Sequence, residues 1–597
     1  MLYRYLRSSC TLLKDIYYRM RFSEFARLLE SLENTSSRLE MYGLLGSLFG
    51  KAGEDEVAPI AYLLEGRLLP AFEGVETGMG ERTTALSIAA ATGCSVDDVA
   101  KASGRLGDLG LVAEELIPRS KRAKFSLTEV YQALLSIART GGRGSTEEKQ
   151  KQLAAILKQA TPIEGRYIVR LILGRLRMGV AAPTIIESVA RREEDSKRAR
   201  RIIERAYNIC SDLGLALSSL SKGGLTTLEK FKVRVGSPVR PMLAERLPSA
   251  EKIIQKIGTC EVEAKLDGFR CQVHFKGRKV GIFSRNLERT TDMFPDIATA
   301  MREEFNARSA ILDGEALAMN VETGEFHPFQ VTIQRKRKQR ISEMAEELPL
   351  YFVAFDLLYV DGKDLTHQSY TARRAELANR IKGGGRLQLS DGELVETADQ
   401  LQNFFDTSLE RGHEGVVAKR LDSGYEPGAR NYNWIKLKRA YQSELNDTVD
   451  VVLIGYLLGR GYRARFGIGS LLGAVYDEAT DTFKSIGKIG SGLSDENWVR
   501  MKSLLDTQSV DHKPARVDSR LIPDVWVEPK FVVTVLADEI TRSPIHTAAQ
   551  DEQGRGLALR FPRVVDFIRD DKSPEDATTT KEIEEMFSQQ RRSRKSS

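Results

Sequence analysis

The chain has 597 residues, of which 41% are hydrophobic and 29% are charged. This balance excludes a largely disordered chain, and the length predicts three or four domains, since single hydrophobic cores stop growing well below this size. Lysine and arginine outnumber aspartate and glutamate by 89 to 83, giving a formal net charge of +6, which permits nucleic-acid binding without requiring it.

The cysteines and the hydropathy pattern exclude several further classes of protein. The five cysteines are widely separated and form no C-x-x-C pair, which argues against a zinc module and a disulfide framework and favours a reducing compartment. No run of about eighteen apolar residues occurs, so we expect no membrane-spanning helix.

Residues 20–235 have the pattern of a helical domain. Apolar residues recur on one helical face near the start of this region, at Phe22, Phe25, Leu28, Leu29 and Leu32. The sequences Ser37-x-x-Glu40 and Thr184-x-x-Glu187 predict capping boxes at two helix starts, and a long apolar stripe with basic flanks predicts a further helix over 199–213. The basic flanks are either a solvated surface or a phosphate contact.

The glycine-rich stretch 141–146 precedes a helix that Glu147 is expected to open. Free N–H groups in such a loop can take a phosphate, and the loop lacks the Gly-Lys-Ser/Thr ending of a nucleotide P-loop. We therefore favour a DNA backbone phosphate over ATP as its ligand, with an ordinary flexible connector as the alternative.

A strand-rich domain is predicted over 236–441, entered through the prolines and glycine of 236–243. The stretch Cys260–Arg270 alternates apolar residues with Glu263 and Lys265, a period of two that places these two side chains on the same face of a half-buried strand. The dipeptide Asp267-Gly268 breaks the pattern as a turn, so Lys265 lies at the mouth of an antiparallel sheet.

A lysine in this position can act as a nucleophile if it is neutral when it attacks. Neighbouring cations or a metal ion would lower its pKa enough to allow this. Taken alone, Lys-x-Asp-Gly occurs by chance in chains of this length, and most such lysines are solvated turn residues.

The region 442–580 predicts a small β-barrel of the OB type, with strands over 449–457, 471–476, 525–537 and 558–568 separated by Gly and Asp turns. From Lys581 the chain is charged and ends in a basic cluster, which predicts a disordered tail over 581–597.

Several short motifs follow Lys265 in a fixed order. They are Ser284-Arg285-Asn286, Leu312-Asp313-Gly314-Glu315, Phe355-Asp356-Leu357-Leu358-Tyr359, Glu414-Gly415-Val416-Val417-Ala418-Lys419 and Trp434-Ile435-Lys436-Leu437-Lys438. This set resembles the covalent nucleotidyltransferases, the superfamily of ATP-dependent ligases and mRNA capping enzymes. The later runs 560–563, 569–572 and 576–579 resemble the closing motif of archaeal and eukaryotic replicative DNA ligases.

The resemblance implies an archaeal-type ATP-dependent DNA ligase, with a helical DNA-binding domain, an adenylylating domain of antiparallel sheets with helices, and a C-terminal OB barrel. Family members are similar to this chain from Met20 onward, so residues 1–19 are expected to be an extension upstream of the working start. The helical domain, including 68–72 and 173–179, resembles the DNA-binding domain of these ligases.

The same resemblance assigns roles to individual residues. Lys265 is the nucleophile that takes AMP from ATP, Glu263 reads the adenine amino group, and Phe355 lies against the adenine face. Mg²⁺ (or Mn²⁺) is held by Glu315 and Glu414, with Glu315 also holding the ribose hydroxyl. The remaining contacts to ribose and phosphates come from Arg270, Arg285, Arg430, Lys436, Lys438, Arg560 and Lys572, with Arg563 and Arg569 as alternatives to Arg560.

The resemblance implies ATP as co-substrate, nicked double-stranded DNA as partner, and a monomeric protein that is cytoplasmic and nucleoid-associated. No convincing motif for a sliding clamp is present, which leaves a clamp open as a partner. One alternative is an RNA ligase or mRNA capping-type enzyme, against which the helical domain and 560–563 argue. The other is a non-catalytic nucleic-acid-binding scaffold, against which the complete motif set argues.

Overall fold

The computed structural model describes residues 19–596, except 36, 177, 321–325, 328, 337–339, 412, 439–447 and 460. The expectation for residues 1–19 therefore lies almost wholly outside the described residues. The described chain forms two compact units, with a boundary between Lys230 and Phe231, and the short segment Arg205–Ser211 belongs to the second unit.

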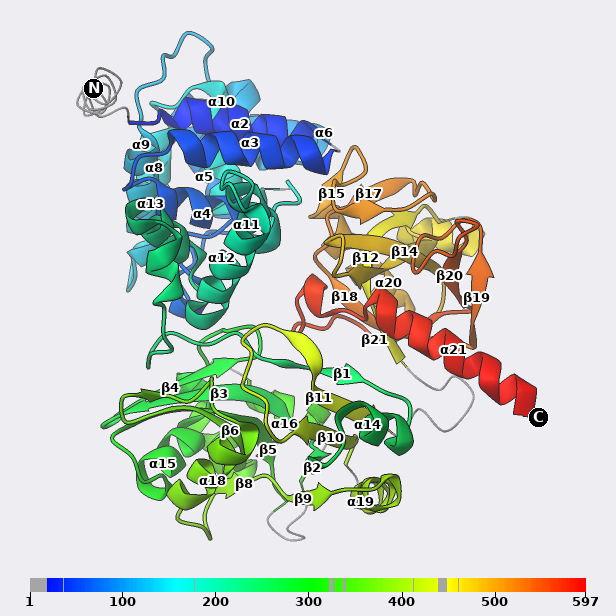
Figure 1. Cartoon of the computed structure of the whole chain (residues 1–597). Helices are drawn as coiled ribbons and strands as arrows, with labels where there is room; N and C mark the ends of the chain where they lie inside the picture. The colour runs from blue at the N-terminus through cyan, green and yellow to red at the C-terminus, as the bar shows by residue number, and fades with distance from the viewer. Residues whose placement is uncertain are drawn as a thin grey trace, which may run out of the picture. The chain divides into compact units, whose positions relative to one another are not determined.

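The first unit is built from helices, as predicted (Figure 1). Its apolar faces form the core, with Phe22, Phe25 and Leu29 fully buried in its first helix. The helices are α2 (Phe22–Asn34), α3 (Arg38–Lys51), α4 (Val57–Leu64), α5 (Glu81–Thr92), α6 (Val96–Leu106), α7 (Leu109–Leu116), α8 (Leu127–Arg139), α9 (Ser145–Leu157), α10 (Pro162–Ile172), α11 (Ala182–Ala190), α12 (Ser196–Cys210) and α13 (Leu213–Glu229).

The two predicted capping boxes have different outcomes. Ser37 caps α3 and accepts a hydrogen bond from the N–H of Glu40, although the Glu40 side chain bonds Thr35 instead of returning to Ser37. The prediction at Thr184 is wrong, because α11 begins two residues earlier at Ala182. Pro183 fits the first helical turn, where no N–H partner is needed, and so moves the start upstream.

Two sheets form the first part of the second unit. One has the strand order β1-β11-β10-β2-β9 and the other β4-β3-β5-β6-β7, with β8 paired to β6. Their bounds are β1 (Leu243–Arg246), β2 (Cys260–Lys265), β3 (Phe269–Lys276), β4 (Lys279–Ser284), β5 (Ser309–Ala318), β6 (Leu350–Val360), β7 (Lys363–Asp364), β8 (Leu387–Leu389), β9 (Gly392–Val395), β10 (Gly415–Arg420) and β11 (Arg430–Lys438).

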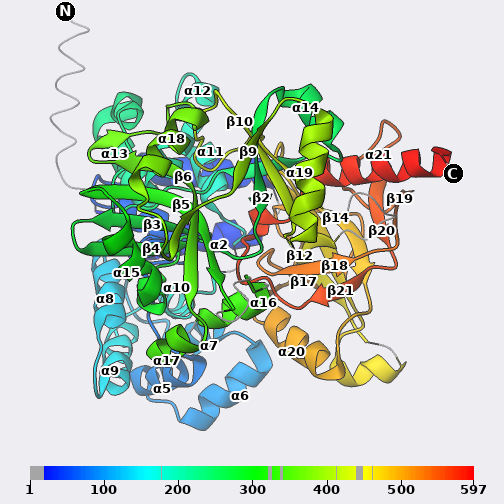
Figure 2. The same cartoon turned by 90° about the horizontal axis from the view of Figure 1, so that it is seen from below.

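Helices cover the outer faces of these sheets. The helices are α14 (Ala250–Ile257), α15 (Pro295–Glu304), α16 (Phe329–Thr332), α17 (Ile341–Glu347), α18 (Tyr370–Arg380) and α19 (Ala398–Glu410). Figure 2 shows α14 and α19 beside the sheet that contains β2, while α15 packs on the other sheet. A separate apolar cluster that includes Met242, Leu358 and Trp434 packs elements of both sheets together. The chain passes from the first sheet to the second between Lys265, at the end of β2, and Phe269, at the start of β3.

The C-terminal part is rich in strands and agrees with the predicted OB-type fold. Its strands are β12 (Thr448–Leu457), β13 (Ser470–Asp477), β14 (Thr482–Ile489), β15 (Ser509–Val510), β16 (Val517–Asp518), β17 (Val525–Val527), β18 (Val532–Leu536), β19 (Glu539–Ser543), β20 (Gly556–Arg560) and β21 (Arg563–Asp566), with helix α20 (Asp495–Asp506). The two long predicted strands, 525–537 and 558–568, are each divided in two. Pro562 separates the second pair, since it cannot donate to a strand ladder.

The predicted disordered tail is wrong, because residues Thr580–Ser596 form helix α21 (red in Figure 1). Ile583 and Met586 lie one helical turn apart and are buried in the core of the C-terminal sheets. Thr579 accepts a hydrogen bond from the N–H of Glu582, and Glu582 accepts one from the N–H of Thr579, a reciprocal cap that starts the helix. The charge-rich composition hid this amphipathic pattern.

Candidate active site

The register of β2, β10 and β11 brings polar side chains to one face of the first sheet. Glu263 lies opposite Val417, and Lys265 lies opposite Gly415. On the next strand Lys436 lies opposite Val417 and Lys438 opposite Gly415. Side chains directly opposite each other in an antiparallel pair point to the same face, so three strands contribute to one polar surface.

This surface forms one wall of a cavity of about 410 Å³. Loops and strands of the second sheet and of the C-terminal part line the rest of it. All but one of the predicted site residues line the cavity, namely Glu263, Lys265, Arg270, Arg285, Glu315, Phe355, Glu414, Arg430, Lys436, Lys438 and Lys572. The exception is Arg560, whose exposed side chain stacks on Phe561 at the end of β20. Arg569 lines the cavity in its place.

Some buried donors of residues that line the cavity have no hydrogen-bond partner among the described residues. Nε of Arg285 and Nε1 of Trp434 are two of them. A buried N–H without a partner is unfavourable by about 1–3 kcal/mol. These atoms are therefore suited to a ligand that brings acceptors such as phosphate or ribose oxygens.

Lys265 is paired with Glu414, whose second carboxylate oxygen is paired with Lys438. Burial lowers the pKa of Lys265, but the carboxylates of Glu414 and Glu315 outweigh it, so the net pKa is raised. The expectation that neighbouring cations lower this pKa is thus wrong for this state. The groups nearest the ammonium are carboxylates, which keep it protonated.

A glycine places Glu414 beside the lysine. Gly415 begins β10 with φ of +148°, and a Cβ atom there would lie 2.1 Å from the carbonyl oxygen of Leu437. Only glycine allows strands β10 and β11 to approach this closely. The N–H of Glu414 then donates to the carbonyl of Lys265 at 3.1 Å, which fixes the two residues side by side.

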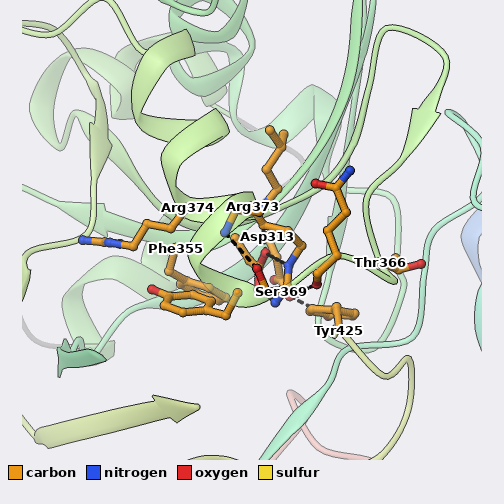
Figure 3. A network of polar contacts seen from close by, with 12 residues as sticks. Asp313, Phe355, Thr366, Ser369, Arg373, Arg374 and Tyr425 are labelled. Atoms are coloured by element: carbon orange, nitrogen blue, oxygen red, sulfur yellow. Dashed lines mark hydrogen bonds and ion pairs between the residues drawn. The ribbon is translucent and has the colours of Figure 1, made fainter. Parts of the chain in front are cut away.

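Glu315 and Arg270 lie opposite each other on β5 and β3. Arg270 donates two hydrogen bonds to the buried Asp313, of 3.2 and 2.7 Å, and Asp313 also accepts from Tyr425 at 2.7 Å (Figure 3). Burial raises the pKa of Glu315 to about 8, since Lys265 and Arg270 offset it only partly. Glu315 therefore releases its proton less readily than an exposed glutamate does, and a further cation beside it would favour its charged form.

Asp-Gly is a common turn pair, yet Asp313 and Gly314 both lie inside strand β5. A Cβ atom on Gly314 would lie about 2.5 Å from the ring of Phe352, so the glycine permits close packing of β5 on β6. The pairing of these strands shifts at this point, which leaves Phe355 as an extra residue between Ala354 and Asp356. Such a bulge redirects a side chain.

Phe355 faces an aromatic and cationic cluster. Its ring lies 5.8 Å from that of Trp434 in an edge-to-face arrangement, and the ammonium of Lys419 lies 4.8 Å from the centre of each ring. The Phe355 side chain is only partly buried and lines the cavity. The protein thus fixes the position of the Phe355 ring, and the part of the ring that lines the cavity can stack on a flat ligand.

Glu263 is buried, with three donors on its carboxylate. Lys419 donates to Oε2 at 2.8 Å, Arg374 donates to Oε1 at 3.0 Å, and the Tyr370 hydroxyl also donates to Oε1. Only 3% of Glu263 is exposed, so it is not a solvated carboxylate on the strand surface.

Carboxylates from the C-terminal part are paired with the cations of the cavity. Glu582 of α21 accepts from Lys436 at 3.0 Å and pairs with Arg430 at 3.1 Å. Asp576 pairs with Arg285 at 3.2 Å, and Asp450 pairs with Lys572. Burial, together with Arg430 and Lys438, lowers the pKa of Lys436 to about 8. In this state the cations thus have internal partners that an anionic ligand can replace.

The carboxylates present fit a magnesium ion. Mg²⁺ is usually bound by one or two carboxylates, with water and phosphate oxygens completing its octahedron. Glu315 and Glu414 line the same cavity, and the charge of Glu414 raises the pKa of Glu315, which shows that the two groups interact. Within the described ranges no group of three or more metal-ligating side chains occurs, so substrate phosphate would supply further ligands.

The sequence did not predict Tyr370, Arg374, Lys419 or Glu582 as site residues. Lys419 could have been predicted, because it is the last residue of the Glu414–Lys419 motif and lies on the same strand face as Val417. Tyr370 and Arg374 lie on α18, outside every motif, and Glu582 lies in the supposed tail.

Comparisons with known proteins agree over the whole chain. Three family models match in order: "DNA ligase N terminus" over residues 21–190, "ATP dependent DNA ligase domain" over 241–438 and "ATP dependent DNA ligase C terminal region" over 464–572. A "Probable DNA ligase" from Dictyoglomus turgidum is 47% identical and covers 96% of this chain and 98% of its own. A "DNA ligase" from the archaeon Pyrobaculum calidifontis is 41% identical and covers 96% and 99%.

A solved structure described as "mycobacterial DNA ligase D complexed with ATP and MES" is 27% identical over 57% of this chain and 97% of its own, with a TM-score of 0.32. No helix among the described residues is long and apolar enough to span a membrane. The four described cysteines, Cys94, Cys210, Cys260 and Cys271, are free thiols, as predicted.

Proposed function

Because this chain belongs to the ATP-dependent DNA ligases and seals nicks in duplex DNA with ATP as co-substrate, we propose that Lys265 is the residue that carries AMP. The observation that supports this is the cavity itself. It places Lys265 among ten further cationic side chains, six of which are the predicted Arg270, Arg285, Arg430, Lys436, Lys438 and Lys572.

Three transfers account for sealing. The Nζ atom of Lys265 attacks the α-phosphorus of ATP, a P–N bond forms, and the bond to pyrophosphate breaks. The 5′-phosphate at the nick then takes the AMP group from the lysine. Finally the 3′-hydroxyl attacks that phosphate, forms the phosphodiester bond and releases AMP. Negative charge accumulates on phosphate oxygens in each step, so fixed cations stabilise each transition state.

The residues of the cavity divide this work. We assign Glu263 and Phe355 to the adenine, and Arg270 and Glu315 to the ribose. Lys436, Lys438 and Arg430 on β11 are assigned to the phosphates, together with Arg285 and Lys572. Arg560 and Arg563 lie outside the cavity and are free to contact DNA or to enter the site after a rearrangement, whereas Arg569 already lines it.

A divalent cation fits the carboxylates of Glu315 and Glu414. Bound there, Mg²⁺ or Mn²⁺ would offset the charge of the phosphates, and Glu414, as its ligand, would raise the pKa of Lys265 less than it does now. Lys265 must lose its proton before it attacks, so the pairing with Glu414 keeps the lysine unreactive without nucleotide and metal.

We propose that the triphosphate of ATP replaces Glu582 at Lys436 and Arg430. We expect Glu582→Gln to lower the KM for ATP in lysine adenylylation about three- to tenfold, because the neutral amide competes less for these cations. Glutamine preserves the cap at Thr579. The exposed Glu584→Gln is the matched control and should leave KM unchanged. An unchanged KM for Glu582→Gln would show that ATP does not compete with this carboxylate.

For the helical unit we propose that the loop 141–146 contacts a DNA backbone phosphate. Gly144, with φ of +82°, leads into α9, whose start has no side-chain cap, and Arg143 is exposed beside it. We expect Arg143→Ala to reduce the slope of log affinity for nicked duplex against log salt by about one. Lys151→Ala, an exposed change on the same helix, is the control. An unchanged slope would favour a plain connector.

We also propose the domain limits 20–235, 236–441 and 442–580, with 581–597 added to the last domain as a docked helix instead of a free tail. A monomer that acts on nicked DNA in the cytoplasm is the simplest assembly, with a sliding clamp as a further partner for which the sequence supplies no motif.

The experiment that tests the proposed roles is labelling with α-labelled ATP and Mg²⁺, followed by a chase with nicked duplex. Lys265 should carry the label, and the chase should remove it as the nick is sealed. A label discharged only by RNA ends would support an RNA ligase or capping-type enzyme, and a folded protein that takes no label would support the scaffold alternative.

A further inference from the structure

Three side chains hold the carboxylate of Glu263, and two of them lie behind the cavity wall. Glu263 and Lys419 line the cavity, whereas Tyr370 and Arg374 of α18 do not. Tyr370 is fully buried, and burial followed by the charge of Glu263 raises its pKa well above the usual range, so its hydroxyl remains a donor. Both residues of α18 can therefore reach a ligand only through Glu263.

Arg374 is itself held on all sides. Its guanidinium donates to the Ser390 hydroxyl at 3.0 Å and to the Ser390 carbonyl at 2.6 Å, and its Nε pairs with Glu261 at 2.7 Å. The neighbouring Arg373 points elsewhere and pairs with Asp356 at 2.7 Å (Figure 3). The donor that Arg374 presents to Glu263 is thus fixed in place.

A count of acceptor positions shows what remains for a ligand. An ionised carboxylate offers about four lone-pair positions, two on each oxygen. On Oε1 of Glu263 both are taken, one by Tyr370 and one by Arg374. On Oε2 one is taken by Lys419. A single acceptor position is left, on the oxygen that Lys419 shares.

We propose that Tyr370 and Arg374 are positioning residues that set the nucleobase specificity of this site, by filling Oε1 of Glu263 and leaving one acceptor on Oε2. A base with an amino group at position 6 donates to that acceptor. A 6-oxo purine places a carbonyl oxygen against it, with no donor between the two oxygens. The inference rests on the proposed function, since it takes Glu263 as the residue that reads the base.

Loss of either donor frees the carboxylate of Glu263 to turn, so that its open acceptor is no longer aimed at the group on position 6 of the base. A site built to bond a specific polar group rejects an analogue that lacks it by large factors, because the buried partner is left unpaired. Relaxing the carboxylate should therefore raise use of the 6-oxo nucleotide more than it lowers use of ATP.

The test compares ATP with inosine triphosphate (ITP) as donors in lysine nucleotidylation by the full chain, measuring kcat and KM for each. The wild type should prefer ATP by about a hundredfold or more. Tyr370→Phe and Arg374→Gln should each lower the ATP-to-ITP ratio of kcat/KM about tenfold, mainly through KM. In a Glu263→Gln background Tyr370→Phe should leave the ratio unchanged, because the effect passes through the carboxylate.

Tyr425→Phe is the matched control, since it also removes a buried hydroxyl donor from a carboxylate, but from Asp313 on the Arg270 side. It should change kcat/KM for ATP and kcat/KM for ITP by the same factor. Equal losses of ATP and ITP use in Tyr370→Phe and Arg374→Gln, with the ratio kept within twofold, would overturn the inference and leave a structural role. Failure of the proposed function would appear separately, as a wild type that ATP does not label on Lys265.

Discussion

Lys265→Arg is expected to abolish both lysine adenylylation and ATP-dependent sealing, a loss of about 10⁴-fold or more, while sealing of a nick that already carries 5′-AMP continues. Arginine keeps a positive charge beside Glu414, so the local ion pair and the fold are preserved. It remains protonated at any working pH and cannot act as a nucleophile. The measurement is a gel assay with α-labelled ATP, run beside a pre-adenylylated nicked duplex.

The pre-adenylylated substrate is the internal control for this prediction. It bypasses both transfers that involve Lys265 and tests only attack by the 3′-hydroxyl. If Lys265→Arg sealed an ordinary nick with ATP, another residue would be the nucleophile. If it failed on both substrates, the variant would be defective in DNA binding or folding, which a thermal melt and a binding assay would distinguish.

Glu414→Gln is expected to lower the rate of lysine adenylylation about 10²- to 10³-fold and to lower the pKa of Lys265. The carboxylate raises this pKa, and burial opposes it. With the carboxylate removed, only the weaker effects of Glu315 and Asp267 oppose the lowering influence of burial, so the lysine loses its proton at a lower pH. The rate should nevertheless fall, because a ligand that we propose for the metal is lost.

The two effects of Glu414→Gln can be measured separately. Titration of ¹³C-methylated lysines by NMR, with Lys265→Arg to identify the signal, reports the pKa without metal or nucleotide. Glu410→Gln, an exposed carboxylate at the end of α19, is the matched control and should change neither quantity. An unchanged pKa for Lys265 would mean that Glu414 does not govern its protonation.

The placement of Lys265 could be predicted from the sequence because it depends on local order. The alternation of residues 260–265 predicts the strand, and the motifs that follow supply Glu414, Trp434 and Lys436. The register of the sheet then brings these residues beside the strand that carries Lys265. Strand pairing translates sequence order into spatial order, and so most of the cavity wall was foreseen.

Other features depend on packing between segments far apart in the chain. Asp313-Gly314 has the composition of a turn, yet Gly314 lies inside β5 because the ring of Phe352 packs against it. The bulge that turns Phe355 toward the cavity follows from the same contact. Neither feature leaves a local signal.

The charged neighbours of the site residues also could not be predicted from the sequence. The expected cationic surroundings of Lys265 proved to be carboxylates, since Glu414 and Glu315 approach from two different sheets. Tyr370 and Arg374 lie on a helix whose own pattern suggests only a surface helix. Their relation to Glu263, more than a hundred residues away, appears only once α18 is packed on its sheet.

The most direct test of the central claim is to locate the AMP group. The chain is incubated with α-labelled ATP and Mg²⁺ and digested, and the modified peptide is sequenced by mass spectrometry, while a parallel sample is chased with nicked duplex. We predict AMP on Lys265 alone, transferred to the 5′-phosphate and released as the nick is sealed. AMP on another residue, or a Lys265 adduct that nicked DNA does not discharge, would contradict the account.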